Sequence, residues 1–241
     1  MFPPLAQLKA RIFLDSASAE EISEYYQTSR EFISGFTTNP TLMKNSGVQD
    51  YKSFMREILN EVRDLPISFE VFADDLDEMK KQAHILAGVA PNVYVKIPVT
   101  NTKGIPTNRL VSELNKEGIP CNVTAIMTLH QIQKIYESLE SSNPIILSVF
   151  AGRIADTGRN PEPILQEICR YVKSQPNISI LWASTRELLN IFQASSSGCD
   201  IVTVTSPLLK KLKNVGKDLD QLSLETVEMF YNDAKSAGYS I

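Results

Sequence analysis

The sequence predicts a (β/α)8 barrel that occupies residues 1–241 as a single domain. Short runs rich in β-branched residues alternate with longer segments of helical period, and this order repeats eight times. The 241 residues suffice for eight such units, and no linker or low-complexity segment divides them. A doubly wound open sheet is the less supported alternative, because no strand is followed by a Gly-x-Gly-x-x-Gly turn into a helix.

The predicted strands are short and apolar. They occupy residues 12–15, 32–37, 67–72, 93–99, 121–126, 145–151, 178–183 and 201–205. Capping residues mark helix starts, such as Ser18 with Glu21 three residues later, and Asp75 before a helix that runs to about residue 87. A last helix is predicted over about 224–237. Glycines stand where helices are expected to stop, at Gly88, Gly118 and Gly198.

Composition excludes several classes of function. The formal net charge is −4 with mixed signs along the chain, so no basic stripe predicts a nucleic-acid partner. No segment has the features of a signal peptide or a membrane span, and we expect a cytoplasmic protein. The three cysteines are widely spaced and fit small core residues rather than disulfides. With two histidines, a metal site is not expected.

Lys96 lies at the centre of the strand predicted over 93–99. Aliphatic residues alternate with Tyr94, Lys96 and Pro98, so this strand would place the lysine on the face opposite four aliphatic side chains. Burial of an ammonium favours the neutral amine, which can attack a carbonyl carbon. Lys96 is therefore a candidate Schiff-base nucleophile. The alternative is a lysine whose flexible stem carries its charge out to water.

The same alternation directs other polar side chains into the barrel with Lys96. The predicted inward residues include Asp15, Ser68, Glu70, Asn122, Thr124, Ser148 and Phe150. Each polar residue has a structural alternative: Asp15 could cap a helix, and a serine or threonine could bond a neighbouring carbonyl. Together they are hard to explain as packing, because unpaired buried polar groups are destabilising.

A second polar cluster follows the sixth and seventh strands. Arg153 comes after the first of these strands, and Ser184 and Arg186 come after the second. Loops at the carboxyl ends of barrel strands line the active mouth, and two guanidinium groups with a hydroxyl could bind a phosphate. The alternative for Arg186 is a surface pair with Glu187 or another nearby acid.

The motifs along this chain, and the order in which they occur, resemble those of a known family, the transaldolases. The similarity runs nearly end to end and involves FLDSA at 13–17, GFTTNPTL at 35–42, VKIP at 95–98, CNVT at 121–124, FAGR at 150–153, ASTR at 183–186 and GCD at 198–200. The resemblance implies that Lys96 forms a Schiff base with a ketose phosphate. Asp15 would accept a hydroxyl proton during carbon–carbon cleavage, and Glu70 with Thr124 would hold a proton-carrying water. The implied contacts to the sugar and its phosphate are Asn39, Asn122, Ser148, Phe150, Arg153, Ser184 and Arg186.

The chain also departs from the family pattern. The sixth-strand motif of the family reads Ser-Pro-Phe-Val-Gly-Arg, and Val149 and Ala151 replace its proline and valine. The short chain resembles a compact branch that includes enzymes which cleave fructose 6-phosphate and release dihydroxyacetone. Those cleaving enzymes carry glutamine at the position of Glu70 and tyrosine at that of Phe150, so both residues favour transfer here.

Three functions remain open at this point: a transferase that moves a dihydroxyacetone unit from a ketose phosphate to an aldose phosphate, a lyase with the same Schiff base, and a catalytically idle binding barrel. No metal or organic cofactor is expected, because the lysine iminium itself accepts the electrons of the broken bond. Phosphorylated sugars are the expected partners. We also expect a homo-oligomer, with the number of subunits open.

Overall fold

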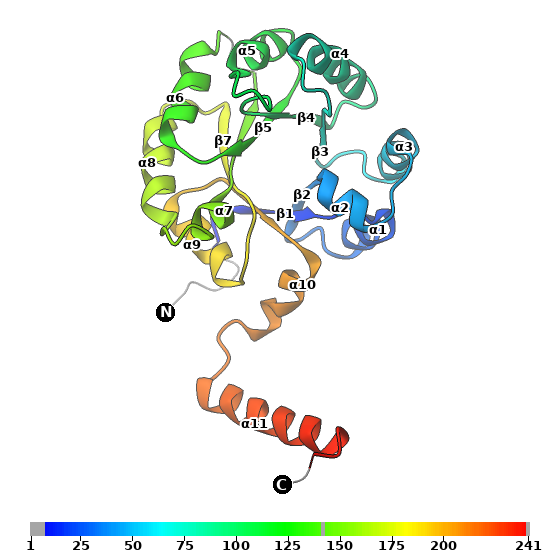
Figure 1. The fold of residues 1–241 in the computed structure, drawn as a ribbon, viewed down its shortest axis with the longest axis vertical. Helices are drawn as coiled ribbons and strands as arrows, with labels where there is room; N and C mark the ends of the chain where they lie inside the picture. The colour runs from blue at the N-terminus through cyan, green and yellow to red at the C-terminus, as the bar shows by residue number, and fades with distance from the viewer. Residues whose placement is uncertain (1–7, 141–142, 240–241) are drawn as a thin grey trace.

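The chain forms a closed barrel of eight parallel strands, which confirms the predicted fold (Figure 1). The computed structural model describes residues 8–140 and 143–239. Each strand pairs with the next, and β8 pairs with β1 to close the barrel. The strands are β1 (Arg11–Asp15), β2 (Ile33–Thr37), β3 (Ile67–Glu70), β4 (Val93–Pro98), β5 (Cys121–Ile126), β6 (Ile145–Val149), β7 (Ile178–Trp182) and β8 (Ile201–Val204).

Helices follow the strands and surround the barrel, except the last one, which projects away from it (Figure 1). They are α1 (Ala19–Thr28), α2 (Pro40–Asn45), α3 (Tyr51–Glu61), α4 (Leu76–Ala87), α5 (Asn108–Lys116), α6 (Leu129–Ser138), α7 (Ala151–Ala155), α8 (Glu162–Val172), α9 (Leu189–Ser197), α10 (Ser206–Leu209), a 3-10 helix (Lys210–Asn214) and α11 (Leu219–Ser236). The predicted N-caps are confirmed, since Ser18 accepts a hydrogen bond from the Glu21 amide and Asp75 accepts from the first turn of α4. The capping box predicted at Ser18 is formed only in this one direction, because the Ser18 amide donates to the Ser16 hydroxyl and not to Glu21. Gly198 ends α9 in the left-handed region, with a φ of 88°.

Two separate apolar clusters show which way the strand residues face. The larger cluster joins strand residues such as Phe69 and Val123 to the helices. The smaller cluster contains strand residues together with Phe150, and it fills the interior of the barrel. Its members are Phe13, Ile146, Leu181, Ala183 and Ile201, packed against Tyr94 and Phe150. The inward and outward alternation predicted from the sequence is thus confirmed.

Gly35 lets the Phe13 ring fill the barrel interior. Phe13 on β1 lies opposite Gly35 on β2, and a Cβ at this glycine would lie 2.6 Å from the ring. That separation is shorter than any real carbon–carbon contact between non-bonded groups, so the position requires a residue without a side chain. The Phe13 ring therefore packs in the barrel interior, two residues before Asp15 on the same strand.

Some predicted boundaries are wrong. The strand predicted over 145–151 ends at Val149, because Phe150 is already the first flanking residue of α7. The strand predicted over 67–72 ends at Glu70. The last helix begins at Leu219 rather than near residue 224, because the Asp218 side chain accepts the amide of Gln221 and starts the helix earlier.

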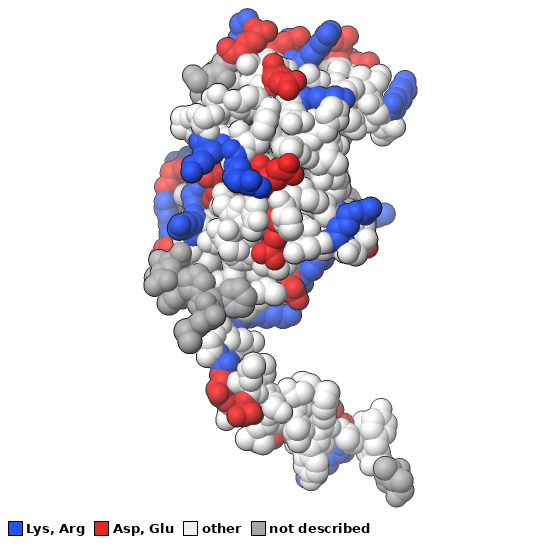
Figure 2. Space-filling view, turned by 90° about the vertical axis from the view of Figure 1, so that its left-hand side faces the viewer, with Lys and Arg blue, Asp and Glu red and all other residues white. Residues whose placement is uncertain are grey.

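Helix α11 projects away from the barrel (Figure 1). Several of its large apolar side chains are more than half exposed, namely Leu219, Leu224, Val227, Phe230 and Tyr231. On the face drawn in Figure 2, basic and acidic side chains are interspersed over the barrel. Within the described residues, no helix is both long and apolar enough to cross a membrane.

Candidate active site

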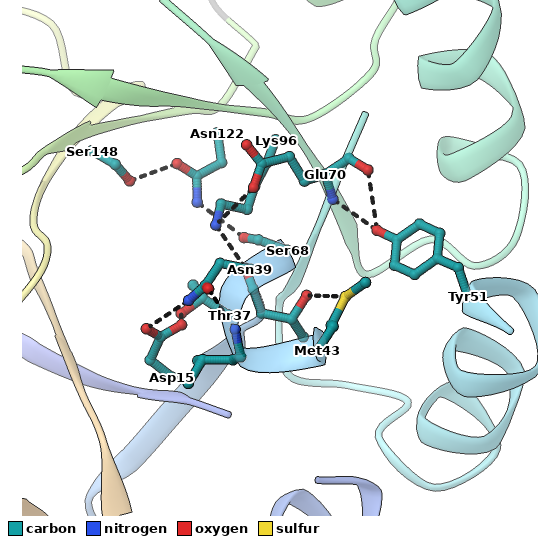
Figure 3. A network of polar contacts seen from close by, with 12 residues as sticks. Asp15, Thr37, Asn39, Met43, Tyr51, Ser68, Glu70, Lys96, Asn122 and Ser148 are labelled. Atoms are coloured by element: carbon teal, nitrogen blue, oxygen red, sulfur yellow. Dashed lines mark hydrogen bonds and ion pairs between the residues drawn. The ribbon is translucent and has the colours of Figure 1, made fainter. Parts of the chain in front are cut away.

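Lys96 lies inside the barrel, as the alternation of β4 predicts. Its residue is 6% exposed, so the side chain does not reach out to water as the alternative interpretation required. The Nζ atom donates a hydrogen bond to the carbonyl oxygen of Thr38 at 2.7 Å and lies 3.6 Å from Oε2 of Glu70 (Figure 3). A primary amine is thus held at a fixed place beside a carboxylate at ion-pair distance.

Strand register places the neighbours of Lys96 at the same level of the barrel. Glu70 on β3 and Asn122 on β5 lie directly opposite Lys96 on either side. The Asn122 side-chain nitrogen donates to the Ser68 hydroxyl at 3.0 Å, and the Ser148 hydroxyl donates to the Asn122 side-chain oxygen at 2.6 Å (Figure 3). Thr124 is buried two residues further along β5. Ser68, Asn122 and Ser148 thus form a hydrogen-bonded row beside the amine, which we call the polar wall of the site.

Asp15 faces the same interior from the end of β1. Its carboxylate accepts a hydrogen bond from the Thr37 hydroxyl at 2.7 Å and one from the Asn39 side-chain nitrogen at 3.3 Å. Asn39 is itself fixed, because its side-chain oxygen caps α2 by accepting the Leu42 amide at 2.9 Å. The alternative role of Asp15 as a helix cap is wrong, since Ser18 caps α1.

Burial raises the pKa of the Asp15 carboxyl above its usual value of 3.8, and the positive charge of Lys96 acts in the opposite direction. The hydrogen bonds from Thr37 and Asn39 also lower this pKa. The affinity of this carboxylate for a proton therefore exceeds that of an exposed aspartate, which suits a group that accepts a proton from a substrate.

The predicted phosphate-binding residues lie on the loops after β6 and β7. Arg153 and Arg186 are exposed, and Ser184 between them in this cluster is partly buried with a φ of 65°. Arg186 donates to Asp156 at 2.5 Å, so the alternative of a surface pair is what this structure contains, although the partner is Asp156 and not Glu187. The two loops are in close contact, because Gly152 packs directly on the Ser184 backbone.

Several residues of the network were not among the predicted site residues. Thr37 could have been found by applying the alternation to β2, where it shares a face with Gly35. The Thr38 carbonyl and the Tyr51 hydroxyl carry no comparable signal, because a backbone acceptor and a residue at a helix start have no periodic pattern. Within residues 8–140 and 143–239, no three carboxylate, imidazole or thiol groups lie close enough to share a metal ion.

The sequence of this chain matches known proteins over most of its length. The family model for transaldolase and fructose-6-phosphate aldolase matches residues 12–241. A protein of Dehalococcoides mccartyi named "Probable transaldolase" is 35% identical over 84% of this chain and 89% of its own. One of Bartonella tribocorum with the same name is 33% identical over 96% of this chain and 99% of its own.

Among solved structures, deoxyribose phosphate aldolase from Aeropyrum pernix is similar in fold. The TM-score is 0.54 at 15% sequence identity, and the alignment covers 89% of this chain and 93% of that one. This likeness concerns the barrel alone, whereas the sequence matches span nearly the whole chain at higher identity. From its sequence matches, the chain belongs to the transaldolase and fructose-6-phosphate aldolase family.

Proposed function

We propose that the protein transfers a dihydroxyacetone unit from a ketose phosphate to an aldose phosphate through a Schiff base on Lys96. The observation that carries this proposal is a buried amine fixed inside a barrel, 3.6 Å from the Glu70 carboxylate and on the same interior as Asp15. The family match and the relatives named "Probable transaldolase" support the same reaction class.

Chemistry at this site would begin when Lys96 gives a proton to Glu70 and adds to the C2 carbonyl of the ketose. Loss of water yields the iminium, with Glu70 returning the proton to the departing hydroxyl through a water held by Thr124. Asp15 then accepts the C4 hydroxyl proton, and the C3–C4 bond breaks. Its electron pair enters the iminium and leaves a three-carbon enamine on Lys96, while C4 departs as the aldehyde carbon of an aldose phosphate. The enamine carbon then attacks the carbonyl carbon of an incoming aldose phosphate, and Asp15 returns its proton to the oxygen that becomes the new C4 hydroxyl. Water hydrolyses the resulting iminium, which releases the new ketose phosphate and frees the amine of Lys96.

Substrate binding would use the polar wall and the two strand-end loops. Asn122 and Ser148 are joined by a hydrogen bond beside Lys96, and Asn39 donates a hydrogen bond to the Asp15 carboxylate. All three would contact sugar hydroxyls. Arg153, Ser184 and Arg186 would bind the phosphate. The Arg186 guanidinium would then bind the phosphate and Asp156 together, or exchange Asp156 for the phosphate.

The choice between transfer and cleavage is tested with fructose 6-phosphate in the presence and absence of erythrose 4-phosphate. A transferase needs the acceptor, so we expect little dihydroxyacetone release without it. Equal release with and without erythrose 4-phosphate would establish the aldolase instead. An absence of both reactions, with no sugar trapped on Lys96, would indicate a binding barrel.

Phe150 is expected to favour transfer, because its apolar ring packs in the barrel interior and cannot order a water near the enamine. Phe150→Tyr supplies a hydroxyl that can do so, and we expect acceptor-independent release of dihydroxyacetone to rise about tenfold or more. The measurement is the ratio of transfer to cleavage, with Phe150→Leu as the apolar control. A ratio that is the same in the tyrosine and leucine variants would contradict this role.

The acidic limb of kcat/KM is expected to come from Asp15, which must be ionised to accept the hydroxyl proton. Its pKa is raised by burial, so activity falls with decreasing pH earlier than it would for an ordinary aspartate. Thr37→Val removes a hydrogen bond that lowers this pKa, and the limb should move to still higher pH. A limb that stays in place or moves to lower pH in Thr37→Val would assign it to another group.

The proposed homo-oligomer is supported by α11. This helix extends away from the barrel and exposes apolar side chains that include Phe230 and Tyr231, at 63% and 65% exposure. A second copy of the chain could cover them, and burial of such side chains would favour association.

A further inference from the structure

The end of β3 lacks part of its strand partner. Strand β2 pairs with β3 through Ser68, whose carbonyl oxygen accepts the Thr38 amide at 3.3 Å. The chain then turns into α2 at Asn39, because Pro40 fixes its backbone and begins the helix. In a strand, residues two apart direct their backbone groups to the same neighbour. The amide and carbonyl of Glu70 therefore face the side from which β2 has departed.

The Tyr51 hydroxyl occupies this place. It accepts a hydrogen bond from the Glu70 amide at 2.9 Å and donates one to the Glu70 carbonyl oxygen at 3.1 Å (Figure 3). Burial raises the pKa of this phenol, so the hydroxyl keeps the proton that it donates. One side chain thus satisfies both backbone groups that a continued β2 would otherwise have paired.

Tyr51 is itself held in a defined position. It is the first residue of α3, and the Asp50 side chain caps that helix by accepting the amides of Lys52 and Ser53. Its ring packs against Phe72 at a centroid distance of 4.7 Å and against Phe69 at 6.1 Å. The hydroxyl therefore links the start of α3 to the last residue of β3 and fixes their relative position.

The Glu70 carboxylate has little else to orient it. Among the described residues, this carboxylate makes one polar interaction, its ion pair with Lys96. Its direction toward the amine consequently depends on where the Glu70 backbone is fixed. On the β4 side, the next residue, Val71, donates to the Lys96 carbonyl oxygen at 3.1 Å, and Tyr51 fixes the opposite side.

We propose that Tyr51 is a positioning residue, whose hydroxyl replaces the missing partner of β3 and holds the Glu70 carboxylate at Lys96 for proton transfer. This inference rests on the proposed function, because it requires Glu70 to carry a proton during imine formation. Tyr51 does not contact the substrate in this role and acts through Glu70.

The test is Tyr51→Phe, which keeps the ring and deletes the hydroxyl. We expect the rate of imine formation with fructose 6-phosphate to fall about three- to tenfold, as for loss of an uncharged hydrogen bond. Borohydride quenching at successive times measures this rate. KM should change little, because no sugar contact is removed. Tyr26→Phe is the matched control, since its hydroxyl binds Asp64 on the surface at 2.7 Å and imine formation should keep its rate.

A double-mutant cycle separates positioning from general stability. In the Glu70→Gln background, Tyr51→Phe should cause no further slowing, because the proton carrier is already absent. Equal slowing in both backgrounds, or an unchanged rate in Tyr51→Phe alone, would overturn the positioning role while leaving the proposed function intact. A Glu70→Gln variant that forms the imine at the rate of the unmodified protein would instead overturn the role of Glu70 and this inference with it.

Discussion

Lys96→Met is expected to reduce turnover of fructose 6-phosphate by about a thousandfold or more while the barrel stays folded, because methionine has no amine that can form the imine. Methionine retains the length of the stem and suits an apolar interior. Lys96→Arg should be equally inactive, since a guanidinium keeps the positive charge beside Glu70 but does not condense with the carbonyl. Steady-state assays measure the turnover, and circular dichroism measures whether the barrel stays folded.

Borohydride added with fructose 6-phosphate should leave one reduced sugar fragment on the peptide that contains Lys96. Lys116→Met is the matched control, because that lysine pairs with Glu140 on the surface and its loss should change neither trapping nor turnover. A mass increase on another lysine, or substantial activity in Lys96→Met, would refute the Schiff base at this residue.

Gly152→Ala is expected to destabilise the protein by about 2–4 kcal/mol, because the new methyl group has no space. A Cβ at this position would lie 1.7 Å from the Ser184 carbonyl oxygen and 2.8 Å from the carbonyl carbon. Both atoms belong to the backbone, so the loops after β6 and β7 would have to separate. Urea denaturation measures the change in the free energy of unfolding.

Separation of these loops should also disrupt the proposed phosphate site, since Arg153 follows Gly152 and Arg186 follows Ser184. The preference for phosphorylated over unphosphorylated sugars should fall about tenfold or more, as when a charge-assisted contact is lost. Gly158→Ala is the control in the same region. The φ of Gly158 is +78°, and a Cβ added there would meet no atom within 4 Å. The substitution should therefore lower the free energy of unfolding by about 1 kcal/mol and leave the preference for phosphorylated sugars unchanged. An unchanged preference in Gly152→Ala would place the phosphate site elsewhere.

The sequence determined the barrel and most of its polar interior. Alternation along β4 directed Lys96 inward, and the same argument placed Glu70, Asn122 and Ser148 on the interior faces of their strands. This reasoning succeeds because successive side chains of a strand point to opposite faces, which is a property of the local backbone. Helix starts such as Asp75 were predicted for a similar reason, since a cap bonds amides two or three residues away.

Contacts between distant segments were decided by the tertiary structure alone. The sequence left Arg186 open between a phosphate and a nearby acid such as Glu187, and only the folded loops show that it pairs with Asp156. Tyr51 lies 19 residues before Glu70, and nothing in either segment indicates that the phenol bonds that backbone. The meeting of Gly152 with Ser184 likewise depends on how two loops leave adjacent strands. Such contacts follow from barrel closure and strand register, which set distances between segments that local periodicity does not specify.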